Sequence, residues 1–416
     1  MKRCILLLVA AVAFFPLQAQ RSTLQEVEAD IERTGGVHFL YPTDQLAPTA
    51  APKGYKPFYV SHLGRHGARY ALGGTVYEEI LDVWTHAKEK GRLTPEGEKF
   101  YEAYLELYPA LARREGVLTE KGQEQHRYIA SQLYKYYPAV FKGATRAEAV
   151  STESHRVIVS MFSFLDQLGR LDKDFTYKAS YGQPHQAYLL PPVIDSGAER
   201  GGEAAVKFGR FRDALVDTDA ILGRWFTKTS KRVKDKYRFC YDMHTMLSTL
   251  DNLDVPVPEV LYGLFTPEER YALWRVNNYR DYQLLGRCPD TENLRMKAMK
   301  ALLDDFITKA DEDIRSGQVQ LRLRFAHDST LMPLLSLMDV NGMGVSLADP
   351  YELENYWQNY NVPMACNFQL IFFKSRKNPD ILVPVLLNGF EARLPLEMAA
   401  PGSFYRWEDI KTHYCQ

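Results

Sequence analysis

The sequence predicts an α/β protein in which helices flank a sheet core and a mainly helical cap subdomain is inserted into that core. Short runs rich in aromatic and β-branched residues predict strands at 57–63, 147–152, 321–325, 367–375 and 381–389. Helical patterns separate most of these runs and fill 202–316 almost completely. Because a chain of 416 residues rarely keeps one continuous core, we expect an α/β core at 20–200 and 317–416 and a cap at 201–316.

The elements of the first half follow from local patterns. Residues 57–63 alternate between two faces, as a strand does, and Gly64 ends the run. Two helices are predicted at 93–116 and 118–141, because each segment begins with a Thr, carries Glu in its first turn and repeats apolar residues at helical spacing. A short strand at 147–152 and a further helix, which ends at Gly169, complete this part.

The second half contains a helical segment followed by returning strands. In the predicted cap, Thr266 is an N-cap, Pro267 takes the first helical position and Glu269 completes a capping box. The strand at 321–325 leads into an apolar helix, and the last two strands flank a turn at 376–380 that predicts a hairpin.

The first residues have the pattern of a secretory signal peptide. Lys2 and Arg3 precede an apolar run at 5–15, and Leu17-Gln18-Ala19 resembles a cleavage site. The run is shorter than the roughly twenty residues that span a bilayer, and no later segment approaches that length. We expect residues 1–19 to be removed, the mature protein to be periplasmic or secreted, and no membrane span.

The charge of the chain argues against nucleic acid as a partner. Removal of Lys2 and Arg3 would lower the 51 basic residues to 49 against 52 acidic residues, which leaves a net charge of −3. A protein that binds nucleic acid is usually basic or carries a long basic stripe, and neither is present.

The cysteines leave the disulfide pattern open. Cys240, Cys288, Cys366 and Cys415 remain after removal of the signal peptide. An even number in an oxidising compartment permits two disulfides in three possible connectivities. Their wide spacing argues against a zinc site, which usually has at least one close pair of ligands.

Charged and histidine side chains follow two predicted strands. The segment RHGAR places Arg65, His66 and Arg69 just after the first strand, and His327-Asp328 follows the strand at 321–325. The ends of strands are where α/β sheets commonly bind ligands. With Arg156 from the first turn of a helix, these residues would form a pocket for a dianion, because the guanidinium fork pairs bidentately with phosphate.

These motifs resemble the second branch of the histidine phosphatase superfamily, the histidine acid phosphatases and phytases. RHGAR matches the family's nucleophile motif, the segment that contains Arg156 is similar to the one that supplies a third arginine, and HDST resembles its His-Asp motif. The segments LTEKGQEQH and LNGFEARLP are also similar to family segments, so the resemblance runs from 58 to 395. The chain departs from the family where Ala71 follows Tyr70 in place of proline. It also differs from the multiple inositol-polyphosphate phosphatases, which it otherwise resembles, in having His-Asp in place of His-Ala-Glu.

The resemblance implies a phosphatase that binds a small-molecule phosphate ester and needs no metal or other cofactor. His66 would be the nucleophile and Asp328 the proton donor. Arg65, Arg69, Arg156 and His327 would bind the phosphate. An unperturbed Asp is ionised at neutral pH, so Asp328 must gain a proton in the loaded site or the enzyme must work in acid.

The sequence leaves several functions open. Inositol phosphates are the favoured substrate, because the cap carries a basic run at 228–238; a broad-specificity or sugar-phosphate phosphatase is the alternative, and that run is otherwise a solvated helix face. A mutase of the same superfamily, an inactive phosphate-ester binding protein and a metal hydrolase using His62 and His66 are more remote. Gly64 and Gly67 argue against the metal hydrolase, because they interrupt the helix that a pair of ligands at i and i+4 requires.

Overall fold

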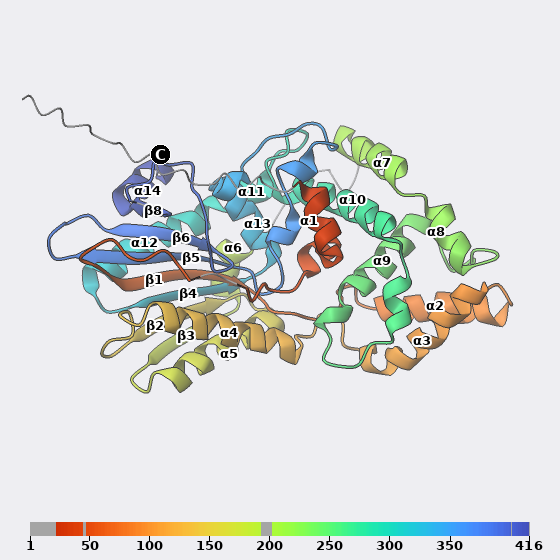
Figure 1. Cartoon of the computed structure of the whole chain (residues 1–416), viewed down its shortest axis with the longest axis horizontal. Helices are drawn as coiled ribbons and strands as arrows, with labels where there is room; N and C mark the ends of the chain where they lie inside the picture. Colours follow the sequence, from red (N-terminus) through yellow and green to blue (C-terminus); the bar gives the residue numbers. More distant parts are fainter. Residues whose placement is uncertain (1–21, 45–46, 193–201, 401, 416) are drawn as a thin grey trace, which may run out of the picture.

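A single mixed sheet forms the centre of the α/β half of the molecule (Figure 1). The computed structural model describes residues 22–44, 47–192, 202–400 and 402–415. The strands run in the order β3-β2-β4-β1-β5-β6-β7, and β8 pairs with β6. The strands are β1 (Tyr55–Arg65), β2 (Arg146–Ser151), β3 (Thr176–Tyr181), β4 (Leu321–Ala326), β5 (Asn367–Ser375), β6 (Leu382–Leu387), β7 (Phe390–Glu391) and β8 (Phe404–Arg406).

The register of the parallel strands brings distant parts of the sequence to one edge. Strands β3, β2, β4 and β1 are parallel, whereas β5 to β8 are antiparallel to their neighbours. Arg65 at the end of β1 lies opposite Ala326 at the end of β4, and Ser151 at the end of β2 lies opposite Phe325. The residues that follow these three strands therefore meet at the same edge of the sheet.

Helices cover both faces of the sheet because successive strand residues point to opposite sides. Leu321, Leu323 and Phe325 of β4 belong to the apolar core beneath α4 and α5. On the other face, Arg322 and Arg324 bond to Asp313 and Asp305 of α12, over 2.7 and 2.6 Å. The helices of this half are α4 (Glu120–Tyr136), α5 (His155–Leu171), α6 (Gln183–Leu189), α12 (Lys300–Ser316), α13 (Asp328–Leu337) and α14 (Trp407–Tyr414).

The other end of the molecule is helical (Figure 1). Its helices are α2 (Val76–Glu89), α3 (Pro95–Leu111), α7 (Glu203–Leu215), α8 (Thr218–Trp225), α9 (Lys236–Ser248) and α10 (Pro267–Leu285). Helix α11 (Leu294–Ala298) lies beside α13 (Figure 1). The capping box predicted for 265–276 is present at the start of α10. The domain boundaries at 201 and 316 stay a prediction. Contacts cross both of them, since α2 and α3 pack on α9 and α8 while α12 contacts β1.

The N-terminal region crosses from the helical end to the sheet. Helix α1 (Thr23–Ala29) leads into η1 (Ile31–His38), a 3-10 segment that packs against α9, α10 and η6 (Asn359–Asn361). The remaining 3-10 segments are η2 (Leu250–Asn252), η3 (Glu259–Gly263), η4 (Val340–Gly342) and η5 (Leu353–Asn355).

The predicted strands all form, and the hairpin at 376–380 joins β5 to β6. Strands β3, β7 and β8 were not predicted, because β7 and β8 span two and three residues and β3 is mostly exposed on both faces. The predicted signal peptide at 1–19 lies outside the described residues. Within the described residues, no helix is both long and apolar enough to cross a bilayer.

The possible disulfides do not form. All four cysteines of the described chain are free thiols. Cys240 and Cys366 are buried in α9 and beside β5, Cys288 is buried after α10, and Cys415 is exposed after α14. The four lie in different parts of the fold, and the three buried thiols pack as small apolar groups in the core.

Candidate active site

The loop after β1 is fixed by backbone hydrogen bonds on both sides. The Arg65 amide donates to the carbonyl of Cys366 over 2.7 Å, and the His66 amide donates to the carbonyl of Ala326 over 3.1 Å. The His66 carbonyl accepts from the amide of Ala365 over 2.9 Å. The backbone of His66 is therefore held as firmly as a residue within the sheet.

Helix α4 packs directly on this loop through two glycines. A Cβ added to Gly67 would lie 2.2 Å from the carbonyl oxygen of Gly122, and one added to Gly122 would lie 2.3 Å from that of Ala68. The freed space lets two loop amides bond to side chains: Gly67 donates to Oγ of Ser160 over 3.1 Å, and Ala68 donates to Oε1 of Gln125 over 2.8 Å. This contact gives a physical reason for a glycine in the segment LTEKGQEQH.

His66 is a neutral imidazole with one nitrogen left for chemistry. Its side chain is 1% exposed, and Nδ1 lies 3.0 Å from the carbonyl oxygen of Gly67. A carbonyl only accepts, so Nδ1 carries the proton and Nε2 keeps its lone pair. Burial lowers the pKa of His66 well below its ordinary value, and the charges of Arg65 and Arg69 lower it further. The ring centre lies 5.7 Å from that of His327.

Arg65 is locked in one orientation. Its side chain is fully buried, and Nη1 donates to the carbonyl oxygens of Val37 and Val362. Nη2 donates to Oδ2 of Asp328 over 2.6 Å. A guanidinium held on both Nη atoms cannot swing away, so the positive charge beside His66 is permanent.

Arg69 and Arg156 add positive charge that is only partly balanced. Burial lowers the pKa of Arg69 to about 9, with a further contribution from the charge of Arg65. Burial also lowers the pKa of Arg156, at the start of α5, although the charge of Asp328 acts in the opposite direction. The Nε atoms of Arg69 and Arg156 are buried and have no hydrogen-bond partner among the described residues. Groups in this state bind an anion strongly, because it supplies the missing partner and the missing charge.

His327 and Asp328 end β4 and begin α13. Oγ1 of Thr152 lies 3.1 Å from Nε2 of His327 and fixes the ring. Burial lowers the pKa of His327 to about 4. Burial acts to raise the pKa of Asp328, but the charges of Arg65 and its neighbours outweigh it and bring the pKa down to about 2. Asp328 is therefore an ionised carboxylate at neutral pH, and its Oδ1 also accepts from the amide of Ser329 over 2.7 Å.

Comparison with known proteins identifies the family. Residues 59–388 match the family model of the histidine phosphatase superfamily (branch 2). The chain belongs to this superfamily. Human multiple inositol polyphosphate phosphatase 1 is 24% identical over 402 residues, which cover 86% of this chain and 79% of the human one. The chain is a histidine-type acid phosphatase, an enzyme that hydrolyses phosphate esters.

Solved structures of relatives share the fold. The multiple inositol polyphosphate phosphatase of Bifidobacterium longum, in complex with inositol hexasulfate, has a TM-score of 0.74 at 17% identity and covers 92% of this chain and 97% of its own. The phytase of D. castellii has a TM-score of 0.73 at 15% identity, and the match covers 99% of this chain and 90% of the phytase. The expected fold, a sheet core flanked by helices, is thus confirmed.

The structure of this phosphatase brings all six predicted site residues together. Arg65, Arg69, Arg156 and His327 lie close enough to His66 for their charges to act on it, and Asp328 pairs with Arg65. Their catalytic and binding roles remain predictions. By contrast, His62 of the metal-hydrolase alternative lies in the aromatic core, where its ring centre is 5.1 Å from Phe164 and 5.4 Å from Phe325.

Other residues of the site have weak sequence signals. Thr152 directly follows β2 and lies just before the helix that carries Arg156, so a search for hydroxyls near the motifs could have found it. Val37 and His38 belong to η1, a segment with no motif. Burial and the charges of Arg69 and Arg65 lower the pKa of His38 well below its ordinary value, which places it beside the arginines.

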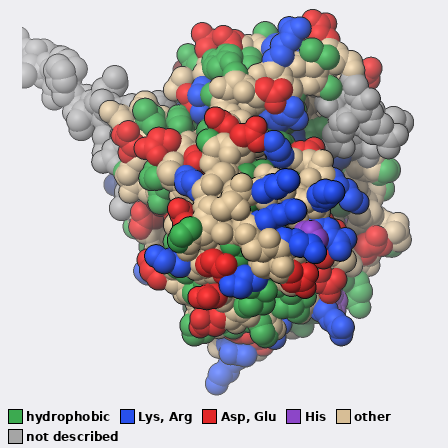
Figure 2. Space-filling model, turned by 90° about the vertical axis from the view of Figure 1, so that its right-hand side faces the viewer, with side chains coloured by type: hydrophobic (Ala, Val, Ile, Leu, Met, Phe, Trp, Pro, Cys, Tyr) green, Lys and Arg blue, Asp and Glu red, His purple; other side chains and the backbone are tan. Residues whose placement is uncertain are grey.

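A cavity of about 430 Å³ opens beside these residues, with Arg69 and Asp328 in its wall. Most of the rest of the wall comes from η1, α9 and α10, with further residues from the loop after β1, α11, α13 and η6. Figure 2 views the helical end of the molecule, where Lys and Arg side chains gather near the middle with acidic side chains beside them. Of the basic run at 228–238, only Arg238 lies in the cavity wall. Arg232 and Lys236 instead pair with carboxylates on the outer surface, so most of the run is a solvated face.

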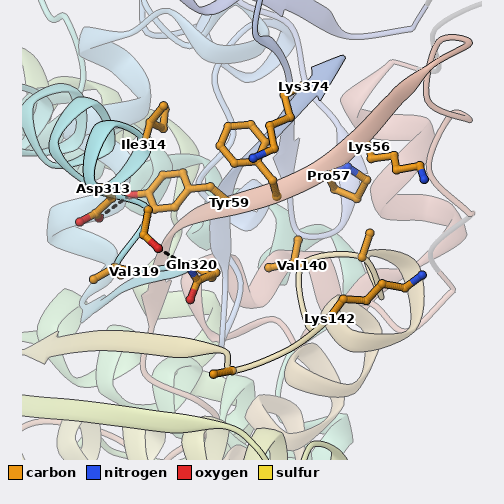
Figure 3. Close-up of a pocket in the computed structure, with 14 residues that line it drawn as sticks. Lys56, Pro57, Tyr59, Val140, Lys142, Asp313, Ile314, Val319, Gln320 and Lys374 are labelled. Carbon is orange, nitrogen blue, oxygen red and sulfur yellow. Dashed lines mark hydrogen bonds between the residues drawn. The ribbon is translucent and has the colours of Figure 1, made fainter. Parts of the chain in front are cut away.

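A larger hollow of about 570 Å³ lies where β1 begins, at the opposite edge of the sheet (Figure 3). Tyr59 bonds to Asp313 in its wall over 3.0 Å, and exposed lysines, Lys56 and Lys142 among them, stand at its rim. None of the six predicted site residues lines it. We therefore place the candidate active site in the smaller cavity, beside His66.

Proposed function

We propose that this phosphatase hydrolyses phosphate monoesters, inositol phosphates foremost, through a phosphohistidine intermediate on His66. We further propose that it does so in the periplasm or outside the cell, after removal of residues 1–19. The observation that carries the proposal is a neutral, buried His66 whose Nε2 is free and which is surrounded by three arginines.

The charges of the site match a phosphate monoester. Arg65, Arg69 and Arg156 carry three positive charges, and Asp328 carries one negative charge when ionised. The two histidines are neutral near pH 7, because burial lowers their pKa values. Until Asp328 takes up a proton, the remaining two positive charges balance the dianion that a phosphate monoester forms at neutral pH. Such neutralisation is needed before a nucleophile can approach the phosphorus.

The first chemical step forms the phosphohistidine. The lone pair on Nε2 of His66 attacks phosphorus, and the bond from phosphorus to the ester oxygen breaks with its electrons on that oxygen. Asp328 donates a proton to the departing alkoxide. Before a substrate binds, Asp328 is ionised because Arg65 and Arg69 lower its pKa to about 2. A bound phosphate offsets these charges, so its arrival raises the pKa of Asp328 and lets it take up the proton that it then delivers.

The second step releases phosphate. The carboxylate that Asp328 has become accepts a proton from water, the water oxygen attacks phosphorus, and the bond to Nε2 of His66 breaks. His66 recovers its lone pair and Asp328 its proton, which leaves both residues as they were before the first step. His327, fixed by Thr152, and the three arginines would hold the phosphate oxygens through both steps.

Inositol phosphates are proposed as substrates because the relatives that share the fold are named for them. A sugar-phosphate phosphatase is the alternative that the cavity also admits. A phosphate-release assay on phytate, glucose 1-phosphate and an aryl phosphate separates the two, and an excess of chelator in every assay tests for metal dependence.

His66→Ala is the decisive variant in this assay. It should lose turnover of every ester, by at least the 10³-fold expected when a nucleophile is removed, while its melting temperature stays near that of the wild type. Thr227→Ala, at an exposed position beside α8, is the matched control and should keep full activity. Wild-type turnover in His66→Ala, or an activity that disappears with the chelator and returns with one divalent ion, would overturn the proposal.

A further inference from the structure

One face each of α9 and α10 forms the cavity wall on the helical side. The α9 residues in the wall include Arg238, Tyr241, Asp242 and Thr245, spaced three and four apart as one face of a helix requires. The α10 residues that face the cavity include Trp274, Asn277, Arg280 and Asp281, with the same spacing. This wall is distinct from the loop that carries His66.

Several polar atoms of this wall are buried without partners. Oδ1 of Asn277, Nε of Arg280 and Nε2 of His244 have no hydrogen-bond partner within the described part of the chain. The three residues line the same cavity. A buried polar atom without a partner costs free energy, so a wall with donors and acceptors in this state is matched to a ligand that carries both.

Asp281 is held as an acceptor by its neighbours. The indole Nε1 of Trp274 can only donate, and it bonds to Oδ1 of Asn359 over 2.9 Å. The amide nitrogen Nδ2 of Asn359 therefore points the other way and donates to Oδ2 of Asp281 over 2.8 Å. The backbone amide of Asn359 is itself fixed by Asn278 over 2.8 Å. The carboxyl is thus oriented before any ligand arrives.

The charge of the wall is mixed. Arg238 and Arg280 are accompanied by Asp242 and Asp281. Asp242 is paired with Arg238 over 2.9 Å and has 13% of its side chain exposed. Asp281 forms no comparable ion pair within the described residues, and it lines the same cavity as Asp328. Burial raises the pKa of Asp281, while the charge of the neighbouring Arg280 lowers it. A carboxylate so close to the phosphate position repels a second phosphate but accepts hydrogen bonds from hydroxyl groups.

We propose that the wall formed by α9 and α10 binds the alcohol part of the substrate, and that Asp281 and Asn277 select inositol phosphates that keep free hydroxyl groups. The proposal rests on the proposed function and sharpens its substrate class. The arginines of the wall bind a further phosphate, while the two acceptors require hydroxyl groups on the ring positions that face them. A fully phosphorylated ring places a phosphate against Asp281 and is turned over less efficiently.

The test compares three substrates. These are phytate, which has no free hydroxyl; an inositol monophosphate, which has five; and 4-nitrophenyl phosphate, whose ring carries neither a hydroxyl group nor a second phosphate. Asp281→Asn removes the charge but keeps the shape, so the ratio of kcat/KM for phytate to that for the monophosphate should rise by about tenfold. Turnover of 4-nitrophenyl phosphate should change by less than about twofold. Asp219→Asn, on the exposed side of α8, is the matched control and should leave all three unchanged.

A second variant guards against misfolding of the first. Asn277→Asp adds a carboxylate to the same wall and should move the ratio in the opposite direction. An unchanged ratio in both variants, or an equal loss on all three substrates, overturns the inference. A wild-type enzyme that hydrolyses none of the three esters would instead refute the proposed function, so the two failures are distinguishable.

Discussion

The side chains around His66 owe their chemistry to burial and to one another. The pKa of His66 is lowered first by burial and then by the neighbouring arginines, so the imidazole remains a free nucleophile in mildly acidic solution. The same arginines lower the pKa of Asp328 to about 2. The groups that bind phosphate thus also keep the nucleophile neutral and deprive the acid of its proton until a substrate arrives.

Replacing Asp328 by Asn should slow the hydrolysis of esters with poor leaving groups more than that of aryl phosphates. A poor leaving group such as an inositol alkoxide needs a proton, whereas an aryl oxide leaves without one. Asp328→Asn should therefore lower kcat/KM for phytate by about 10²- to 10⁴-fold, and the phosphorylation step with 4-nitrophenyl phosphate by much less. Steady-state kinetics measure kcat/KM, and burst kinetics measure the rate of the phosphorylation step. Equal losses in the phosphorylation step for both substrates would mean that another group supplies the proton.

Residue identities were the most predictable part of the site. Arg65, His66 and Arg69 all lie in the short segment RHGAR at the end of a strand, so one motif contains them. Thr152, which fixes His327, has only a weak sequence signal, and Val37, which binds Arg65 through its carbonyl, has none. A backbone carbonyl has no sequence signal, and a lone Thr has many ordinary uses.

At the level of elements, the site depends on close packing between α4 and the loop after β1. Gly67 and Gly122 let two backbones approach to a distance that a methyl group on either residue would prevent. The helix was predicted from its Thr and Glu start, and that Thr, Thr119, also bonds to the carbonyl of Ala68 over 3.1 Å. The need for a glycine at 122 became apparent only when the loop was placed beside it.

Gly122→Ala should damage both stability and catalysis. The added methyl would lie 2.3 Å from the carbonyl oxygen of Ala68, so α4 or the loop must move. We expect a loss of about 1–3 kcal/mol in the free energy of unfolding, together with a lower kcat. Gly223→Ala in α8 is the control: no atom lies within 4 Å of its added Cβ, and it should gain about 0.5–1 kcal/mol. Chemical denaturation measures the free energy of unfolding of each variant, and turnover assays measure its kcat. A wild-type kcat in Gly122→Ala would contradict the role given to this contact.

For the whole molecule, the parallel sheet and the helical end together create the cavity. The order of strands and the face that each helix covers depend on pairing between segments far apart in sequence, such as β1 with β4, which local patterns do not encode. The fold class was predictable because apolar residues repeat with a different period in strands than in helices. The cavity wall was not, because it combines η1, α9, α10 and α11, and the basic run that suggested a polyanion site lies mostly on the outer surface.

The buried histidines predict how stability changes with pH. Burial lowers the pKa of His62, His126 and His244 to about 3, whereas in the unfolded chain these groups titrate near 6.5. Between these values the unfolded state binds protons that the folded state does not. The free energy of unfolding should therefore fall as pH drops from 6.5 towards 3, by up to about 1.4 kcal/mol per pH unit for each histidine.

A substitution isolates one of these groups. The ring of His126 lies 5.7 Å from that of Phe325, so His126→Phe removes the titration and keeps an aromatic ring in the same place. Its stability should depend less on pH between 6.5 and 4 than that of the wild type, as measured by denaturation at several pH values. His413→Phe, at an exposed position, should leave the slope unchanged. Identical slopes in all three proteins would show that His126 does not stay neutral in the fold.

The central claim is that phosphate passes through His66, and trapping the intermediate tests it most directly. Asp328→Asn should be mixed with a labelled aryl phosphate and quenched in alkali within milliseconds, because the phosphorus–nitrogen bond of phosphohistidine is labile in acid. In this variant the first step needs no acid and the second lacks its base, so the intermediate accumulates. The account predicts label on the peptide that contains His66, approaching one phosphoryl group per chain and absent from His66→Ala. Turnover without any labelled peptide, or label on a different residue, would contradict it.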